Sequence, residues 1–568
     1  MGRTLSTAVR ASATVWSDVV GNPDLRRLEI GRTWSVMAEA IATVGFAVYA
    51  FQRNGPLAIA GLVAVQMLPG ALAAPWLSGV ADRFRREQVL RVAELTRGLA
   101  MAVTAVLVHG HAPVPVVAVM AAVLSVASAT FYPARRSLVP LLVRTPRELT
   151  SANVASSTLQ SAGLMLGPIV SGAVLALDGI IVWPVFAIAA VAFLGSALGL
   201  LRIRNTSTVW LPARSEGESA RRTAVRTVLA DPHLQAVLSA FTVKNLARGA
   251  FAVFVVTIPL SLLQLKTPAV GYLSAALGAG GLTAGLLGGA ALLHGRRLAR
   301  LMVGGLLLWS LPMFMIAATP TALAALVGLA AVGLGNSVVD VSGYTLITRN
   351  AADDVLARVY GLHETTRAIG ISLGAFVTAV GVDNVGTRAT LVAAGAVVTV
   401  AALALWAPLA SVDRASRVPT ERLALLRSSR LFGRLQPLAL ERLAKRMQPV
   451  SVAPGDAIVR EGEVGQAVYL VSEGTLDVVS AGRTVAALRH GDHFGEIALL
   501  QASPRTASVV AETPATVFML DGEDFMTAVS GHPISSSLAR STADERLREL
   551  AGLAGGDGPG SAPAGATD

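Results

Sequence analysis

Residues 79–90 read GVADRFRREQVL, and this short charged segment separates two long apolar stretches, 57–81 and 90–109. Each stretch contains about 20 residues or more, and a helix of that length crosses the roughly 30 Å hydrocarbon core of a bilayer. A charged segment between two such stretches is typical of the loop that joins two membrane-spanning helices. The sequence therefore predicts a membrane hairpin here, and the same alternation continues in both directions along the chain.

Apolar stretches of similar length occupy most of the first 410 residues. Besides the two above, they lie near 30–51, 114–132, 152–177, 181–201, 234–263, 268–293, 299–318, 320–347, 356–382 and 388–410. Hydrophobic residues make up 53% of the chain and charged residues only 15%, well below the roughly 25% of an ordinary soluble protein. We expect an α-helical membrane protein with twelve transmembrane helices in two six-helix halves.

Basic residues are distributed unequally between the predicted loops. Alternate loops are rich in arginine, as at 83–86, whereas the loops between them hold little beyond Arg53, Lys266 and Arg388. The positive-inside rule places arginine-rich loops in the cytoplasm. We therefore expect a multi-pass protein of the plasma membrane, or of the inner membrane of a two-membrane cell, with both termini cytoplasmic. This topology accounts for the formal charge of +11, so no nucleic-acid partner is predicted.

The character of the sequence changes after residue 410. Residues 422–447 have the pattern of an amphipathic helix, and from 450 to about 520 short alternating segments are separated by turn residues. Such a pattern predicts a small cytosolic β-roll with flanking helices, the last near 534–550. The predicted divisions are a lead-in at 1–28, helix halves at 29–201 and 233–410, a link at 202–232, a linker at 411–421, a domain at 422–550 and a disordered tail at 551–568.

Ionisable residues inside the predicted spans are functional candidates, because a charge at membrane depth is costly. They are Glu39, Lys244, Arg248, Asp340, Glu364 and Arg367. Lys244 and Arg248, four residues apart, share one helix face. In one interpretation, Glu39 or Asp340 exchanges a proton while Lys244 and Arg248 contact an anionic substrate. In the other, the charges pair structurally, for example Glu39 with Lys244. Both stay open for Glu39 and Asp340, and the structural one is favoured for Glu364 with Arg367.

The segment 79–90 resembles the loop signature of the major facilitator superfamily of transporters. It shares the glycine, the Asp-Arg pair and a basic residue of that signature, at Gly79, Asp82, Arg83 and Arg86. The glycines and Pro168 within 163–172, together with the preceding text at 131–157, are similar to the exporter branch. Over roughly residues 20–410 the resemblance implies a secondary transporter, and an exporter of a small amphipathic or lipid-like compound whose identity stays open.

A second motif, FGEIALLQASPRTAS at 494–508, has the residues that a cyclic nucleotide requires. A cyclic phosphate is held by free backbone amides at a helix N-terminus and by a guanidinium, and a ribose hydroxyl by a carboxylate acceptor. Gly495 permits close backbone approach, while Glu496 and the amides of Ile497 and Ala498 open a short helix. Arg505 follows nine residues after Glu496.

This segment matches the phosphate-binding cassette of the cyclic-nucleotide-binding family, and the flanks 431–444, 454–479 and 517–526 are similar to that family too. The resemblance implies that Glu496 holds the ribose hydroxyl and Arg505 the cyclic phosphate. Gly495, Ile497 and Ala507 would then supply backbone contacts. Thr506 occupies the position whose hydroxyl contacts guanine in the cGMP-dependent kinases of this family, but bacterial cAMP receptors often carry a hydroxyl there too. The resemblance therefore favours cAMP as the regulatory ligand, with cGMP as the alternative.

Other classes of function have less support. An ion channel would need six spans, a voltage-sensing helix and a filter loop, which the sequence lacks. With no cysteine and no nucleophile–base or metal-ligand pattern, we expect neither an enzyme nor a metal or cofactor site. A membrane-anchored nucleotide sensor that does not transport remains open, as does a C-terminal domain without ligand. The sign of regulation, the coupling ion and the oligomeric state are not fixed by the sequence.

Overall fold

The computed structural model describes residues 17–530, except 18, 85, 143–145, 178–180, 202–229, 294–296, 351–352, 416–419, 430, 434, 436 and 502. The chain forms two compact units that divide between Ala415 and Ser416. The predicted tail, the helix near 534–550, most of the lead-in and most of the central link lie outside the described residues.

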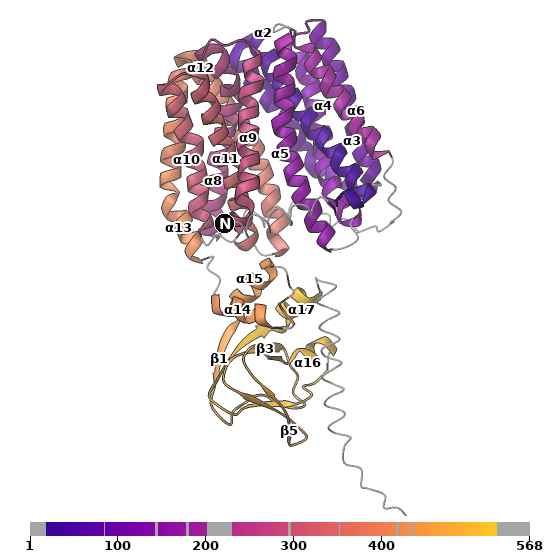
Figure 1. The fold of residues 1–568 in the computed structure, drawn as a ribbon, viewed down its shortest axis with the longest axis vertical. Coiled ribbons are helices and arrows are strands. Elements are labelled where there is room, and N and C mark those ends of the chain that lie inside the picture. Colours follow the sequence, from indigo (N-terminus) through magenta and orange to yellow (C-terminus); the bar gives the residue numbers. More distant parts are fainter. Residues whose placement is uncertain are drawn as a thin grey trace, which may run out of the picture. The chain divides into compact units, whose positions relative to one another are not determined.

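The first unit is a bundle of long helices that run side by side (Figure 1). Their bounds are α2 Pro23–Arg83, α3 Arg86–His109, α4 Val114–Leu142, α5 Pro146–Leu177, α6 Trp183–Leu200, α8 Pro232–Thr257, α9 Pro268–Leu293, α10 Leu298–Ala318, α11 Ala322–Asn350 and α12 Asp353–Ala404. Helix α8 continues into a π-helical turn, η1 (Ile258–Leu262). Its start is fixed by Asp231, whose carboxylate accepts hydrogen bonds from the backbone N–H groups of His233 and Leu234.

Two of these helices each contain a sharp kink, so each covers two spans. Backbone angles depart from helical values at Asn54 and Gly55 in α2 and at Gly386 in α12, between spans that the sequence separates at 51–57 and 382–388. Within the described residues, nine helices are long and apolar enough to cross a membrane. With α2 and α12 counted as two spans each, and α9 added, these helices coincide with the twelve predicted spans.

Glycines bring several helices into backbone contact. Gly172 of α5 lies against Gly271 of α9, and a Cβ on Gly271 would lie 2.4 Å from the Gly172 Cα. A Cβ on Gly280 of α9 would lie 1.8 Å from the carbonyl oxygen of Ala330 in α11. Only residues without a side chain allow such close crossings.

A last short helix, α13 (Trp406–Ala415), ends the first unit. Its Asp413 is buried and accepts hydrogen bonds from the backbone N–H groups of Ala299 (2.9 Å) and Arg300 (3.2 Å), at the start of α10. A carboxylate at a helix N-terminus satisfies N–H groups that have no partner within the helix. The helical bundle therefore continues to Ala415, past the predicted end of the second half at 410.

The second unit is a β-roll of two four-stranded antiparallel sheets, with strand orders β1-β8-β3-β6 and β2-β7-β4-β5. The strands are β1 Gln448–Val452, β2 Ala457–Val459, β3 Ala467–Glu473, β4 Leu476–Ser480, β5 Arg483–Leu488, β6 His493–Phe494, β7 Ser508–Ala511 and β8 Ala515–Asp521. Side chains that alternate along a strand fill two separate cores. In β3, Val471 packs inside the roll, whereas Val468 and Leu470 pack against helices.

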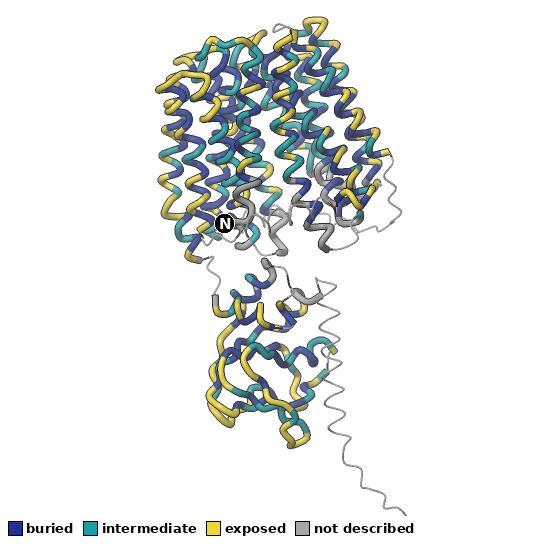
Figure 2. Tube along the Cα trace, viewed as in Figure 1, coloured by how far each residue is buried: buried dark blue, intermediate teal, exposed yellow. Residues whose placement is uncertain are grey.

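Those helices are α14 (Thr420–Ser428), α15 (Pro437–Arg446) and α17 (Gly522–Ser530). In this unit most residues of β3 are buried, whereas most residues of β5 are exposed (Figure 2). Phe432 and Phe525 are fully buried and pack edge to face at 5.9 Å. A further short helix, α16 (Glu496–Gln501), lies between β6 and β7 and carries the cassette.

Candidate functional site

The cassette begins where β6 ends. Gly495 follows Phe494 with φ +89°, a left-handed conformation that glycine adopts without steric cost. Glu496 then opens α16, so the chain turns from strand to helix within one residue. Glu496 is only 1% exposed, and Ile497 and Ala498 are buried beside it. The sharp turn places the first backbone N–H groups of α16 next to Gly495.

Arg505 closes the cassette from the other end. Its Nη1 donates to the carbonyl oxygen of Gly495 at 2.7 Å and its Nη2 to that of Ala467 at 2.8 Å. Burial lowers the pKa of the guanidinium, while the negative charges of Glu496 and Glu463 act in the opposite direction. Both interactions place these carboxylates within electrostatic range of Arg505. An arginine stays charged under such conditions, so the site contains a fixed cation.

The loop before β3 fits around this cation. Gly462 N–H donates to the Arg505 carbonyl at 2.9 Å, and Arg505 N–H donates to the Glu463 carbonyl at 2.8 Å. A Cβ on Gly465 would lie 2.2 Å from the Arg505 Cζ atom, so a glycine is required there. The text EGEVG at 461–465 is therefore part of the site, a role that the sequence analysis assigned only to 494–508.

A cavity of about 340 Å³ lies beside the guanidinium, within the roughly 300–1,000 Å³ range of small-molecule sites. Its lining consists of Ile458, Val459, Glu463, Val464, Gly465, Gln466, Ala467, Tyr469, Arg505, Met519 and Asp521. Tyr469 stacks on Phe494 with ring centroids 5.0 Å apart. Glu496 does not line this cavity. The structure thus brings Gly495, Glu496 and Arg505 together, with only Arg505 facing this space.

The remaining cassette residues lie on the strand side. Ala507 is buried, and the Thr506 carbonyl accepts a hydrogen bond of 3.5 Å from Ser480 Oγ of β4. This contact uses the backbone of Thr506, so the assignment of its hydroxyl to base recognition stays a prediction.

In the membrane unit, the charged candidates form two separate groups. Lys244 Nζ of α8 lies 2.5 Å from Asp340 Oδ1 of α11, and Asn336 Nδ2 donates to the same carboxylate at 3.1 Å. Glu364 and Arg367 pair within α12 at 2.7 Å, as the structural interpretation expected. The suggested pairing of Glu39 with Lys244 is wrong, because Glu39 belongs to the other group.

Glu39 of α2 pairs with Arg97 of α3, whose Nη2 lies 2.7 Å from Glu39 Oε2. Arg97 also contacts Glu94 at 3.1 Å. Glu94 and Arg97 were not among the candidates predicted from the sequence, although both lie inside the predicted span 90–109, three residues apart. Two opposite charges at that spacing inside an apolar stretch are the signal that identifies them.

Arg248 differs from the other candidate cations. It is exposed, and within the part of the chain that the structure describes it makes no hydrogen bond or ion pair. It interacts electrostatically with Arg367, Asp340 and Glu364, and Lys244 interacts with it in turn. Among the described residues of this group, three cations therefore face two carboxylates, which leaves one positive charge in excess.

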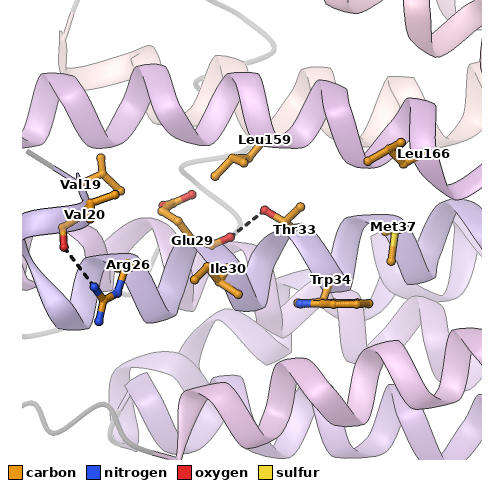
Figure 3. Close-up of a pocket in the computed structure, with 10 residues that line it drawn as sticks. All are labelled: Val19, Val20, Arg26, Glu29, Ile30, Thr33, Trp34, Met37, Leu159 and Leu166. Atoms are coloured by element: carbon orange, nitrogen blue, oxygen red, sulfur yellow. Dashed lines mark hydrogen bonds between the residues drawn. The ribbon is translucent and has the colours of Figure 1, made fainter. Parts of the chain in front are cut away.

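A groove of about 480 Å³ lies between α2 and α5, with Val19 and Val20 at one end (Figure 3). Its walls are apolar, among them Ile30, Trp34 and Leu166, and its two charged residues are Arg26 and Glu29. The Glu29 carboxylate is bound by Arg135 of α4 at 2.6 Å. The groove therefore combines an apolar surface with charge confined to a few residues.

For the loop motif at 79–90, the structure describes the course of the backbone but not the side chains of its signature residues. Helix α2 ends at Arg83 and α3 begins at Arg86, which confirms a tight connection between the second and third spans. The side chains of Asp82, Arg83 and Arg86 lie outside the described residues, as does the environment of Gly79, so a functional role of this motif stays a prediction.

Comparisons with known proteins also divide the chain into two parts, with matches that meet near residue 450. The family model of the Major Facilitator Superfamily matches residues 30–375 and 245–450, and that of the cyclic nucleotide-binding domain matches 449–532. Among curated proteins, the potassium/sodium hyperpolarization-activated cyclic nucleotide-gated channel 3 of Mus musculus is 32% identical over 120 residues, or 21% of this chain. Channel 2 of Homo sapiens is 31% identical over 126 residues, or 22% of this chain.

The chain spans only 15% of the length of the mouse channel and 14% of the human one. Among solved structures, the regulatory domain of Toxoplasma gondii PKA with cAMP is 23% identical, with 25% of this chain and 55% of that one covered and a TM-score of 0.22. A putative cAMP-binding regulatory protein from Silicibacter pomeroyi is 21% identical, with 24% and 65% covered and a TM-score of 0.20.

Proposed function

The chain belongs to the major facilitator superfamily, and we propose that it is a secondary transporter whose activity is regulated by a cyclic nucleotide. Its C-terminal domain belongs to the cyclic nucleotide-binding family, and cAMP is the favoured ligand, with cGMP as the alternative. The proposed cargo is a small amphipathic or lipid-like compound that is exported. We place the protein in the plasma or inner membrane with both termini in the cytoplasm, and assign it no enzymatic activity, cofactor or nucleic-acid partner.

The arrangement around Arg505 is the observation that carries the regulatory part. A buried guanidinium, a left-handed glycine and the N-terminal amides of a short helix lie within one 15-residue segment. This combination suits a single phosphate group. The adjoining cavity of about 340 Å³ offers room for the rest of a nucleotide, with Tyr469 and Met519 as apolar surfaces.

The cargo class is supported by the membrane unit. Arg248 makes no hydrogen bond or ion pair within the described residues, and the described part of its group has one excess positive charge, so an anionic group on the cargo would complete the charge balance. The groove between α2 and α5 supplies an apolar surface for the body of an amphipath. A compound with one anionic group and an apolar body fits both features.

Regulation requires that the nucleotide bind more tightly to one state of the transporter than to another. Couplings of this kind are commonly about 1–3 kcal/mol, or roughly 5–150-fold in an equilibrium. We therefore expect a severalfold change of transport rate with cAMP, and not an absolute dependence on it.

The test uses the purified full chain in proteoliposomes with a fluorescently labelled anionic single-chain amphipath as the probe. Efflux or uptake under an imposed pH gradient is measured with and without cAMP. We expect transport that changes with cAMP in the wild type, transport without a cAMP response in Arg505→Glu, and cAMP binding without transport in Arg248→Gln. Calorimetric cAMP binding with no transport under any gradient would support the anchored sensor, and no binding would support a structural C-terminal domain.

A further inference from the structure

A second charged cluster lies in the first half of the membrane unit and is not used by the cargo site proposed above. Arg97 of α3 stands between two carboxylates: its Nη1 contacts Glu94 Oε1 at 3.1 Å and its Nη2 contacts Glu39 Oε2 at 2.7 Å. Ser35 of α2 accepts from Arg97 Nη1 at 2.8 Å and donates to Glu94 Oε1 at 2.7 Å. The four side chains form one connected network between α2 and α3.

The network is enclosed on its other sides by aromatic rings. The Arg97 guanidinium lies over Phe193 of α6 at 4.4 Å and over Phe131 of α4 at 5.1 Å. The side chains of Arg97 and Glu94 are fully buried, whereas that of Glu39 is 38% exposed. The cluster therefore has a closed end at Glu94 and an open end at Glu39.

Among the described residues of the cluster, the charges do not balance if both carboxylates are ionised. One guanidinium contacts two carboxylates, and Arg135, a further cation on α4, is bonded to Glu29. Within the described residues, Glu94 Oε2 is buried and has no hydrogen-bond partner. An ionised carboxylate in that position would leave a buried negative charge partly unsolvated, which is far more costly than a neutral acid.

We propose that Glu94 and Glu39 share one exchangeable proton across Arg97, and that this cluster is the proton-coupling site of the transporter. In the structure described here, the proton resides on Glu94 while Arg97 holds the ionised Glu39. When the proton passes from Glu94 to Glu39, Arg97 becomes the counter-ion of the ionised Glu94, and the neutral Glu39 exchanges the proton with water on the side on which it is exposed. The proton leaves one carboxyl group as it binds to the other, so the transfer keeps a single carboxylate charge in the cluster.

The sequence left proton exchange open for both Glu39 and Asp340, and this assignment distinguishes between the two residues. Asp340 has a cation of its own in Lys244 and an amide donor in Asn336, so nothing in its surroundings calls for a proton. Glu39 and Glu94 both contact the same cation, Arg97. Proton exchange thus belongs to the first half and anion binding to the second.

The first experiment measures proton occupancy without any transport. Infrared spectra of the reconstituted full chain at neutral pH should contain the carbonyl band of a buried neutral carboxyl group, and Glu94→Gln should remove it. Glu39→Gln should remove it too, because Glu94 then has Arg97 to itself and ionises. Glu364→Gln, at an exposed pair within one helix, is the matched control and should leave the band unchanged. A band that survives in both Glu94→Gln and Glu39→Gln would overturn the proposal.

The melting temperature of Glu94→Gln is an independent test of the protonation state of Glu94. It remains informative if the variant folds poorly, because poor folding would itself count against a neutral Glu94. A neutral Glu94 is replaced closely by glutamine, so the melting temperature of Glu94→Gln at neutral pH should match the wild type. If Glu94 were an ionised structural partner, that variant would melt well below the wild type, and the proposal would be wrong.

The coupling part rests on the proposed transport function and has its own readout. In proteoliposomes, Glu94→Gln should lose amphipath transport driven by a pH gradient while retaining exchange of labelled for unlabelled amphipath. Equal loss of both activities would contradict proton coupling at this site. Failure of all transport in the wild type would sink the proposed function, yet would leave the infrared result on Glu94 intact.

Discussion

Arg505 Nη1 donates a hydrogen bond of 2.7 Å to the carbonyl oxygen of Gly495, so the two ends of the cassette are tied together by a charged side chain. Gly495 has no room for a larger residue, because a Cβ there would lie 2.5 Å from the same Nη1 atom. Glycine is therefore favoured at this position for two reasons. It allows the left-handed turn into α16, and it leaves space for the guanidinium to contact the backbone.

Reversing the charge at this seat should abolish nucleotide binding. Arg505→Glu removes the cation and places a carboxylate where a phosphate would lie, so cAMP affinity should fall by more than about 100-fold. Calorimetric titration of the purified full chain measures it. Arg489→Ala, at an exposed residue of the β5–β6 turn, is the control and should bind like the wild type. Unchanged binding by Arg505→Glu would refute the site.

Glu496→Gln tests the predicted contact with the ribose hydroxyl. Glu496 is buried at the start of α16, and a hydrogen bond to a charged acceptor contributes about 1.5–3 kcal/mol. We expect cAMP affinity to fall about 10-fold to 100-fold with the fold of the domain retained. The comparison with 2′-deoxy-cAMP is decisive, because the variant should bind it as tightly as the wild type does. An equal loss for both nucleotides would assign Glu496 a structural role.

Thr506→Ala tests the choice of base. If the hydroxyl contacts guanine, its removal should lower the affinity for cGMP severalfold and leave that for cAMP nearly unchanged. Competition titrations of the two nucleotides on one protein sample measure the ratio directly. Ser480→Ala is a useful comparison, because Ser480 contacts only the backbone of Thr506. A parallel decrease for both nucleotides would remove Thr506 from base recognition.

Removing either partner of the Lys244–Asp340 pair should lower the stability of the protein, but by unequal amounts. The Lys244 side chain is 3% exposed and that of Asp340 is 27% exposed. Asp340→Asn leaves a fully buried cation and should cost about 3–5 kcal/mol, whereas Lys244→Met leaves a partly solvated carboxylate and should cost less. Thermal melting in detergent should show this order, and the double variant should have a higher melting temperature than Asp340→Asn. Equal losses in both single variants and an additive double variant would contradict a buried pair.

Two adjacent glycines of α9 test the close helix crossings. A Cβ on Gly280 would overlap the Ala330 carbonyl, whereas one on Gly281 would lie 3.4 Å from its nearest neighbour, Ser337 Oγ. Gly280→Ala should therefore lower the yield of folded protein and its melting temperature, at a cost of about 1–3 kcal/mol or more. Gly281→Ala should remain near the wild type in the same assays. Similar behaviour of the two variants would argue against the crossing.

Hydropathy was sufficient to locate the membrane helices, because the energetic requirement for about 20 apolar residues acts on local sequence. It also located the turns, since the kinks at Gly55 and Gly386 lie in the short gaps between predicted spans. The cassette was equally local: Gly495, Glu496 and Arg505 lie within eleven residues of sequence, and the geometry brings them together.

Pairing between distant helices could not be predicted in the same way. Lys244 and Asp340 are 96 residues apart, and Glu39 and Arg97 are 58 apart, so their contacts depend on which helices are neighbours. Sequence patterns indicate that a charge in a span needs a partner, but not which one. The same reason explains Tyr469 and Gly465, whose roles follow from the approach of β3 and its preceding loop to Arg505.

The hydrogen bonds between Asp413 and the first turn of α10 affect how a force on the chain would reach the helical bundle. Residue 413 is three positions from the point where the chain enters the second unit, and its carboxylate holds two backbone N–H groups of another helix. A force that travels along the polypeptide from the nucleotide-binding side therefore reaches the start of α10 through Asp413, as well as the core of the second half through the buried Leu409 and Val412. Asp413 adds a directional polar attachment to contacts that are otherwise apolar.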